Sequence, residues 1–271
     1  IWIQQEGWEE PSVAGTKIVE NLNKAMELDP DLAEVHYQNA VMAQLVEWDW
    51  GKSEKEFLKS LAINPNNPLT RMMYAQLLLI LNRSDESIAQ RELAISLDPL
   101  NLFTKLLYIG TLVQAGDCKA SLPLFEEAMH ANQEDYNLNQ MLVLAAYKCE
   151  DYDKVIKSLK YGLPIPIEEE KYKEIKRIYD VSGIVHAYEE LMKYMEKYAE
   201  KNYVGFFFMA GGYITANKPD KAMDWIEKGF EMHDPQMMYI ASPGQYFDSL
   251  YDNPRFIAVL KKMKLQLPEP L

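Results

Sequence analysis

Apolar residues recur along this chain at intervals of three and four, the spacing that places them on one face of an α-helix. No segment shows the strict alternation of apolar and polar residues that predicts a β-strand. Turn residues divide the pattern into helices, which we expect at about 13–28, 33–47, 51–63, 68–81, 84–97, 102–115, 118–131, 136–149, 152–162, 168–180, 183–201, 203–216, 219–232 and 254–263. The pattern therefore predicts an all-α chain.

The helical pattern also repeats along the sequence. The tripeptides Leu28-Asp29-Pro30, Ile63-Asn64-Pro65 and Leu97-Asp98-Pro99 place their prolines 35 and 34 residues apart. A period of about 34 residues is typical of a repeat built from two antiparallel helices. Because proline lacks an N–H group and disfavours a helical conformation in the residue before it, each tripeptide is expected to separate two helices.

Small side chains keep the same phase as these prolines. They stand five residues before each proline, and a larger residue stands three positions earlier, in the pairs Leu22 and Ala25, Phe57 and Ser60, and Arg91 and Ala94. Two helices approach closely only where a small side chain lies at their crossing, and the larger residue fills the gap beside it. The phase continues through Ser121, Phe125 and Ala128, then Val155, Leu159 and Gly162, and finally Ala222, Ile226 and Gly229.

The phase is lost between about residues 163 and 203, after the proline-broken segment Leu163-Pro164-Ile165-Pro166. We expect three parts: an N-terminal array at 1–162, a linker with irregular helices at 163–202, and a C-terminal unit at 203–271. The last part includes a short closing helix from Pro254 to Met263, for which Asn253 is the expected cap.

The repeat resembles the tetratricopeptide repeat. Several segments more specifically resemble the repeat-containing C-terminal half of bacterial multidomain signalling proteins: 48–50 (WDW), 53–57 (SEKEF), 61–66 (LAINPN), 81–88, 97–100, 247–250 and 252–256. The resemblance implies a right-handed α–α superhelix of about six helix pairs. It also implies a link to adenylate or guanylate cyclase, winged-helix or protein kinase domains. None of these is visible here, so we expect that the chain is not itself an enzyme and that any catalytic domain lies outside it.

Composition narrows the class of partner. The chain has 271 residues and a formal net charge of −13, which disfavours binding to nucleic acid. No apolar stretch approaches the ~20 residues that span a bilayer. Two widely spaced cysteines, Cys118 and Cys149, do not form a disulfide framework, although a pair between neighbouring units stays open. They favour a reducing compartment, so we expect a cytoplasmic protein.

Residues that could carry chemistry are better explained by structure. The four histidines, His36, His130, His186 and His233, lack the spacing of metal ligands, and we expect neither a metal nor a cofactor. The run Glu168-Glu169-Glu170 is expected to start a helix, where carboxylates favour the helix dipole. Gly211-Gly212 lies within a helical pattern and predicts a close helix contact.

A curved array of helix pairs presents a concave face, which the first helix of each pair lines. We expect that face to bind a protein or peptide segment through residues spaced one helical turn apart: Tyr37, Val41, Gln44, Met72, Gln76, Phe103, Leu106, Asn137, Gln140 and Tyr147. Amides would pair with a peptide backbone, and apolar side chains would anchor it. The face lacks the basic residues that would clamp a terminal carboxylate. Two alternatives stay open, namely a domain that senses a ligand for an attached output domain and a module for homodimerisation.

Overall fold

The computed structural model describes residue 20 and residues 23–24, 27–29, 31–100, 105–106, 108–110, 112, 118–130, 133–242 and 246–267. Within these residues, the side chains of 118–120 and 137 are also left undescribed. The helices expected at 13–28 and 102–115 therefore lie largely outside the described residues.

The described residues form helices and turns and contain no strand. The α-helices are α3 (Ala33–Met42), α4 (Trp50–Ile63), α5 (Pro68–Ile80), α6 (Ser84–Leu97), α8 (Cys118–Met129), α9 (Tyr136–Lys148), α10 (Tyr152–Gly162), α11 (Glu169–Ala199), α12 (Phe206–Thr215), α13 (Pro219–Glu231) and α14 (Pro254–Met263). Most expected boundaries of the described helices are confirmed to within about three residues, but the helix expected at 33–47 ends as an α-helix at Met42. Three short elements were not expected: the π-helical turn η1 (Ala43–Glu47) and the 3-10 turns η2 (Pro235–Tyr239) and η3 (Tyr246–Leu250).

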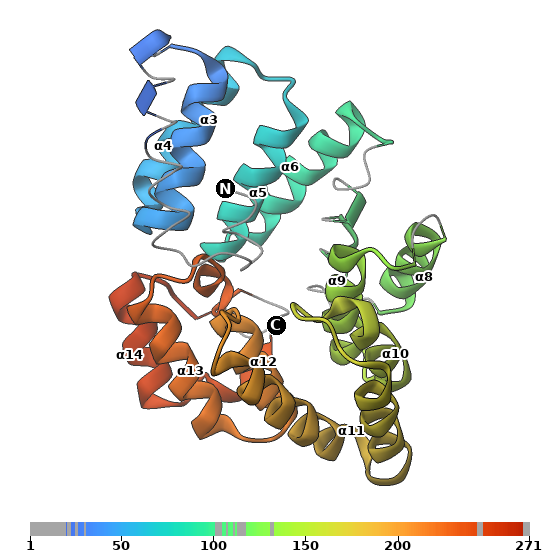
Figure 1. The fold of residues 1–271 in the computed structure, drawn as a ribbon. Helices are drawn as coiled ribbons and strands as arrows, with labels where there is room; N and C mark the ends of the chain where they lie inside the picture. The colour runs from blue at the N-terminus through green and yellow to red at the C-terminus, as the bar shows by residue number, and fades with distance from the viewer. Residues whose placement is uncertain are drawn as a thin grey trace.

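Neighbouring helices pack as pairs, α3 with α4, α5 with α6, α9 with α10 and α12 with α13 (Figure 1). The stretch α11 contains two helices separated at Gly183, where φ is 83° and ψ is 179°. This break falls between the two irregular helices that the sequence predicted. As expected, Glu168 precedes the start of α11, and Asn253 caps α14 by accepting a hydrogen bond from the Arg255 N–H group.

Small residues lie at the helix crossings, as the sequence phase predicted. Ser60, Ala94 and Ala222 are fully buried. A Cβ atom on Gly162 would lie 2.8 Å from the carbonyl carbon of Asn139, so only glycine allows α10 to approach α9 this closely. A similar contact explains Gly212, on which a Cβ atom would clash with the Met192 sulfur.

The turn inside each pair has the same geometry. Asn82, Glu150 and Asn217 follow the first helix in the left-handed conformation, with φ of 59°, 56° and 55°. The next N–H group then donates to a carbonyl five residues earlier, as in Arg83 to Leu78, Asp151 to Ala146 and Lys218 to Tyr213. This arrangement satisfies carbonyl groups that the end of a helix leaves without partners.

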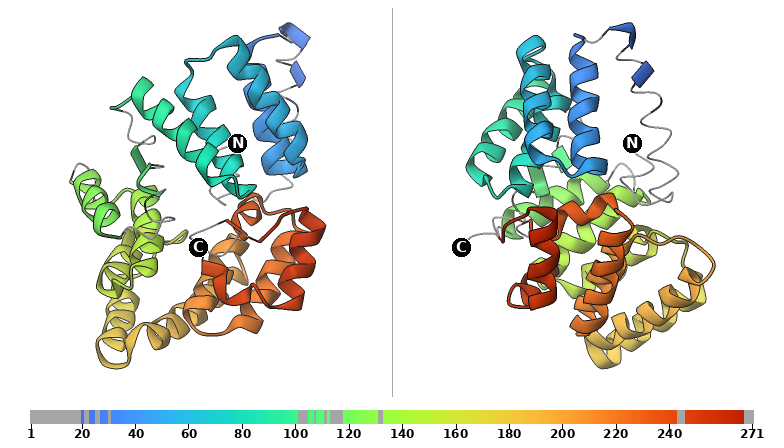
Figure 2. Two further views of the ribbon diagram at one scale, coloured as in Figure 1. Left: turned by 180° about the vertical axis from the view of Figure 1, so that it is seen from behind. Right: turned by 90° about the vertical axis from the view of Figure 1, so that its left-hand side faces the viewer.

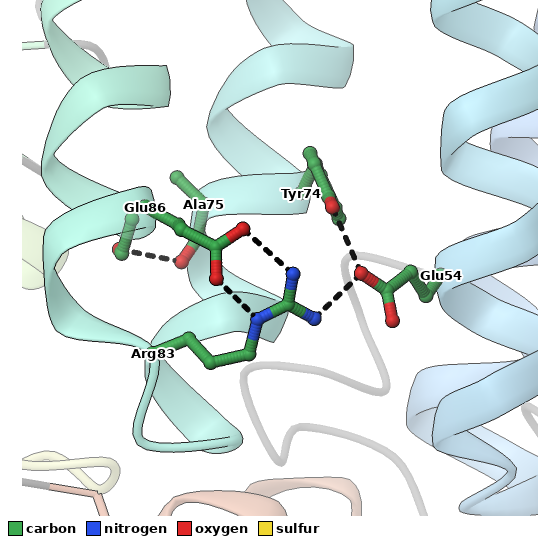
Figure 3. Close-up of polar contacts among 6 residues, drawn as sticks. Glu54, Tyr74, Ala75, Arg83 and Glu86 are labelled. Atoms are coloured by element: carbon green, nitrogen blue, oxygen red, sulfur yellow. Dashed lines mark hydrogen bonds and ion pairs between the residues drawn. The ribbon is translucent and has the colours of Figure 1, made fainter.

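Polar side chains fasten α4 to the next pair (Figure 3). Arg83 donates two hydrogen bonds to Glu86, at 2.6 and 2.7 Å, and a third to Glu54 of α4, at 2.6 Å. The Tyr74 hydroxyl donates to the same Glu54 oxygen at 2.9 Å. Arg83 lies in the turn between α5 and α6, so one guanidinium group connects two successive repeats.

The two ends of the described array meet, so its helix pairs form a closed rather than an open curve. Figures 1 and 2 show α13 and α14 beside the lower ends of α3, α4 and α5. The indole N–H of Trp50 donates to the Met263 carbonyl at 2.8 Å, and the Asn82 amide donates to the Gln266 carbonyl at 2.9 Å. One apolar core joins residues 40–80 to residues 210–265. The curvature of successive helix pairs has brought the C-terminal unit back to the first repeat.

Two further findings concern the expected compartment. Cys149 is disulfide-bonded, so the cysteines do not support the reducing compartment that their spacing favoured. Within the described part of the chain, no helix is both long enough and apolar enough to cross a bilayer.

Candidate protein-binding face

Helix α9 has two buried faces and a third that remains half-buried. Leu138, Leu142 and Ala145 lie in one core with Phe125 of α8. Val143 and Ala146 lie in a second core with α10 and α11. The half-buried positions that recur along the third face are Tyr136, Gln140, Leu144 and Tyr147, which we call the α9 stripe. Their spacing of three and four residues places them together on the helix surface.

The α9 stripe combines aromatic, aliphatic and amide groups. The Gln140 amide donates to the Tyr136 hydroxyl at 3.0 Å, which holds both side chains along the helix. Burial raises the pKa of the Tyr147 phenol, so its hydroxyl keeps its proton at neutral pH. These groups present hydrogen-bond donors and acceptors beside apolar surface, a combination that suits an interface with a peptide.

The turn η3 borders one end of the α9 stripe. The rings of Tyr147 and Tyr246 have centroids 5.2 Å apart, and Lys148 forms an ion pair with Asp248. Tyr246 also packs on Gly211 of α12, where a Cβ atom would lie 2.8 Å from the ring. The expected close contact at this glycine is therefore confirmed, and its partner is a ring from η3. The Tyr147 end of the α9 stripe thus contacts the C-terminal unit.

The first helices near the N-terminus are covered more completely. On α5, Met73, Leu77 and Ile80 are spaced by three and four residues and belong to the core that joins the two ends of the chain, and Gln76 is half-buried. Tyr37 of α3 lies 6.3 Å from the ring of Phe57, and burial raises the pKa of Tyr37 to about 12. These positions pack within the molecule and leave little surface for a partner.

The ten residues expected on the concave face therefore separate into three groups. Four are half-buried: Tyr37, Gln76, Gln140 and Tyr147. Four are buried: Val41, Gln44, Met72 and Leu106. Phe103 and the side chain of Asn137 lie outside the described residues. The structure brings Gln140 and Tyr147 together on the α9 stripe.

Sequence reasoning missed Tyr136, Leu144 and Tyr246. Tyr136 and Leu144 stand four residues before and after Gln140, so helical spacing alone could have added them. Tyr246 had no such signal, because it belongs to a 3-10 turn far along the chain that the fold brings to α9.

The histidines take up structural contacts. His36 forms a 2.6 Å contact with Glu56, and His186 contacts the Ser182 carbonyl. His233 stacks on Trp48 with 4.0 Å between ring centroids. Among the described residues, no three His, Cys, Asp or Glu side chains lie together as metal ligands would.

Comparison with known proteins agrees with this architecture. A tetratricopeptide repeat model matches residues 56–89, which span the second half of α4, all of α5 and the start of α6. No protein of curated function matches the sequence. The Cut9–Hcn1 hetero-tetramer of APC/C contains a chain that is 15% identical, with a TM-score of 0.53 over 96% of this chain and 47% of that one.

Two further solved structures are more distant in geometry. PilF of Pseudomonas aeruginosa is 16% identical, with a TM-score of 0.45 over 84% of this chain and 88% of that one. YrrB, described as a TPR protein with an unusual peptide-binding site, is 13% identical, with a TM-score of 0.41 over 80% and 94% of the two chains.

The helix pairs and the likeness to the Cut9–Hcn1 structure define the class: the chain is an all-helical repeat superhelix. Within that class, residues 56–89 form a repeat of the tetratricopeptide type.

Proposed function

We propose that this chain is a protein-interaction module that binds a peptide or protein segment through the α9 stripe. The observation that carries the proposal is that these four side chains lie half-buried along one face of α9, where Tyr147 also contacts the ring of Tyr152 in α10. Leu144 and Tyr147 offer apolar anchors, and the Gln140 amide offers polar groups to a peptide backbone. Anchors of this kind carry most of the free energy of binding at protein interfaces.

The chemistry of the α9 stripe also indicates the kind of peptide. The partner would be a short segment with apolar side chains one helical turn or two extended residues apart, so that two of them reach Leu144 and Tyr147 together. Because Lys148 is already paired with Asp248, the recognition of a single terminal carboxylate is not part of the proposal.

Peptides selected from a random library on the purified chain test this function. We expect their dissociation constants, measured by calorimetry, to rise about tenfold for Leu144→Ala, because truncating an anchor costs more than about 1 kcal/mol. Lys157→Ala on the exposed side of α10 is the matched control and should leave affinity unchanged. Selected peptides that bind wild type and Leu144→Ala equally well would contradict the proposal.

We further propose that the chain is the regulatory arm of a larger signalling protein. The support is the resemblance of the segments at 48–66 and 247–256 to the repeat regions of such proteins. The sequence of the complete polypeptide tests this: we expect a cyclase, kinase or winged-helix domain joined to the repeats. A complete polypeptide without any output domain would exclude it.

A further inference from the structure

The corner at Trp48 differs from the equivalent corners of the other pairs. Asn82 and Asn217 adopt the left-handed conformation elsewhere, and asparagine tolerates it well. Trp48 adopts it with a φ of 51°, which strains a bulky residue. The π-helical turn η1 directly precedes it, and the Asp49 N–H group donates to the Ala43 carbonyl, one residue further back than at the other corners. Backbone strain and π-turns are both frequent at functional sites, and strain also occurs in segments that switch between conformations.

The strained corner is held by the opposite end of the chain. The indole ring of Trp48 stacks on His233, with 4.0 Å between centroids and 11° between planes, and lies 5.8 Å from the Phe230 ring. His233 is itself a left-handed corner, with a φ of 54°, so two helix ends meet ring to ring. Trp48 is only 7% exposed. Contacts across the junction therefore compensate the local strain.

The polar contacts between described residues that cross this junction differ in strength. Besides the bonds from Trp50 to the Met263 carbonyl and from Asn82 to the Gln266 carbonyl, the Gln44 amide reaches the Met238 sulfur at 3.5 Å. A thioether sulfur is a weak acceptor. Gln44 is fully buried, so its amide has replaced hydrogen bonds to water by a weaker contact with sulfur.

Several buried polar atoms at the junction lack a hydrogen-bond partner within the part of the chain that the structure describes. They are Gln44 Oε1, Trp48 Nε1 and Asn82 Oδ1. Two buried hydroxyl groups within helix pairs do have partners, since Ser53 donates to the Ala40 carbonyl and Ser87 to the Ala75 carbonyl. An unpaired buried polar group loses its hydrogen bonds to water without replacement. Opening the junction would let these groups form hydrogen bonds with water and would relieve the backbone strain at Trp48. Both effects offset part of the free energy that is lost with the apolar contacts.

We propose that the junction between the first repeat and the C-terminal unit is a clasp, formed by Trp48, Trp50 and Asn82 on one side and His233, Met238 and Met263 on the other. The clasp opens while the helix pairs on both sides stay folded. Opening converts the closed array into the open curve that other helical repeats use. The clasp goes beyond the proposed function and does not depend on it, because its opening is measured on the protein alone.

Native-state hydrogen exchange of the wild-type chain gives the first test. We expect the Trp50 indole N–H group, which donates across the clasp to the Met263 carbonyl, to be protected from exchange at least tenfold less than the Asp151 and Val155 amides, which are hydrogen-bonded within the α9–α10 pair. Equal rates at both sites would mean that the clasp opens only when the whole chain unfolds, which overturns the proposal.

The variant Trp48→Asn gives the second test, because asparagine keeps the left-handed corner and removes the stacked ring. We expect a larger radius of gyration in X-ray scattering and faster exchange of the Trp50 indole N–H group, with the Asp151 and Val155 amides unchanged. Glu150→Asn, at the equivalent corner of the α9–α10 pair, is the control and should change neither measurement. A Trp48→Asn chain with wild-type dimensions and exchange, or one that loses protection uniformly, would refute the clasp.

Discussion

At the scale of single residues, the position three residues before each small crossing residue accepts side chains of very different chemistry. Phe57 and Arg91 occupy the same position in successive repeats, and both are buried, with exposures of 0% and 4%. Burial lowers the pKa of Arg91 to about 10, although the neighbouring Tyr239 opposes this shift. A pKa of about 10 leaves the guanidinium charged at neutral pH. The second repeat therefore holds a cation where the first holds an aromatic ring.

Ala94→Trp tests the crossing in the same helix. Ala94 is fully buried, so a large ring would overfill the space between α5 and α6 and should lower the free energy of unfolding by roughly 1–3 kcal/mol. Ala89→Trp, on the exposed side of α6, should change it by less than about 0.5 kcal/mol. Thermal unfolding measures both effects, and we expect Ala94→Trp to have the lower melting temperature. Equal melting temperatures for the two variants would show that the repeat register is wrong.

Glu56 makes the stability of the first repeat depend on pH. Burial raises the pKa of this carboxyl, but hydrogen bonds from Lys59 and His36 lower it further than burial raises it. A carboxyl with a lowered pKa in the folded state stabilises the protein above its ordinary pKa. That stabilisation is lost as the pH falls from the ordinary value of about 4.3 through the lower folded value.

Urea unfolding at a series of pH values measures this effect. In that acidic window, we expect the wild type to lose more stability than Glu56→Gln, whose side chain does not titrate. Glu127→Gln, at an exposed position of α8, should follow the wild-type curve. Parallel curves for wild type and Glu56→Gln would show that the Lys59 and His36 contacts do not stabilise the folded chain.

At the scale of elements, the π-helical turn η1 explains an irregularity in the sequence. Pro30 and Pro65 are 35 residues apart, whereas Pro65 and Pro99 are 34 apart. A π-turn accommodates one extra residue within a helix, and η1 lies inside the longer interval. The extra residue belongs to the segment that ends at the strained Trp48 corner.

Two glycine-to-alanine substitutions, each within a helix, should have opposite effects on the stability of the chain. Gly162→Ala would place its methyl group against the Asn139 backbone, which cannot move aside, so we expect a loss of roughly 1–3 kcal/mol. Gly51→Ala meets nothing closer than 3.8 Å within α4 and should stabilise the chain by about 0.5–1 kcal/mol, because alanine favours the helix. Denaturant unfolding measures both; a stabilised Gly162→Ala would mean that α10 does not lie this close to α9.

At the scale of the whole molecule, contact between the two ends changes how the repeats depend on one another. In an open array each repeat contacts only its neighbours, so a change at one end is not felt at the other. Here Phe256, Leu260 and Met263 of α14 share a core with Trp48 and Trp50. We therefore expect that a change that destabilises one end of the described chain also destabilises the other end.

Deletion of residues 254–271 tests this dependence. We expect faster hydrogen exchange in the first turn of α4, where the Ser53 amide donates to the Asp49 carbonyl, because Trp50 loses its acceptor on Met263. Lys261→Ala, an exposed change that keeps α14, should leave this exchange unaltered. Unchanged exchange in α4 after the deletion would indicate that the ends are independent.

The sequence determined the helices, their pairing and their turns, because these depend on contacts between residues close in the chain. Apolar spacing, the Asp-Pro and Asn-Pro breaks and the small crossing residues are all local signals, and Gln140 and Tyr147 could be placed on one helix face for the same reason. Only the tertiary structure decided that the ends meet, that Trp48 stacks on His233 and that Tyr246 borders the α9 stripe. Small rotations between successive pairs add up over the array, and their sum brings together residues whose spacing carries no trace of the contact.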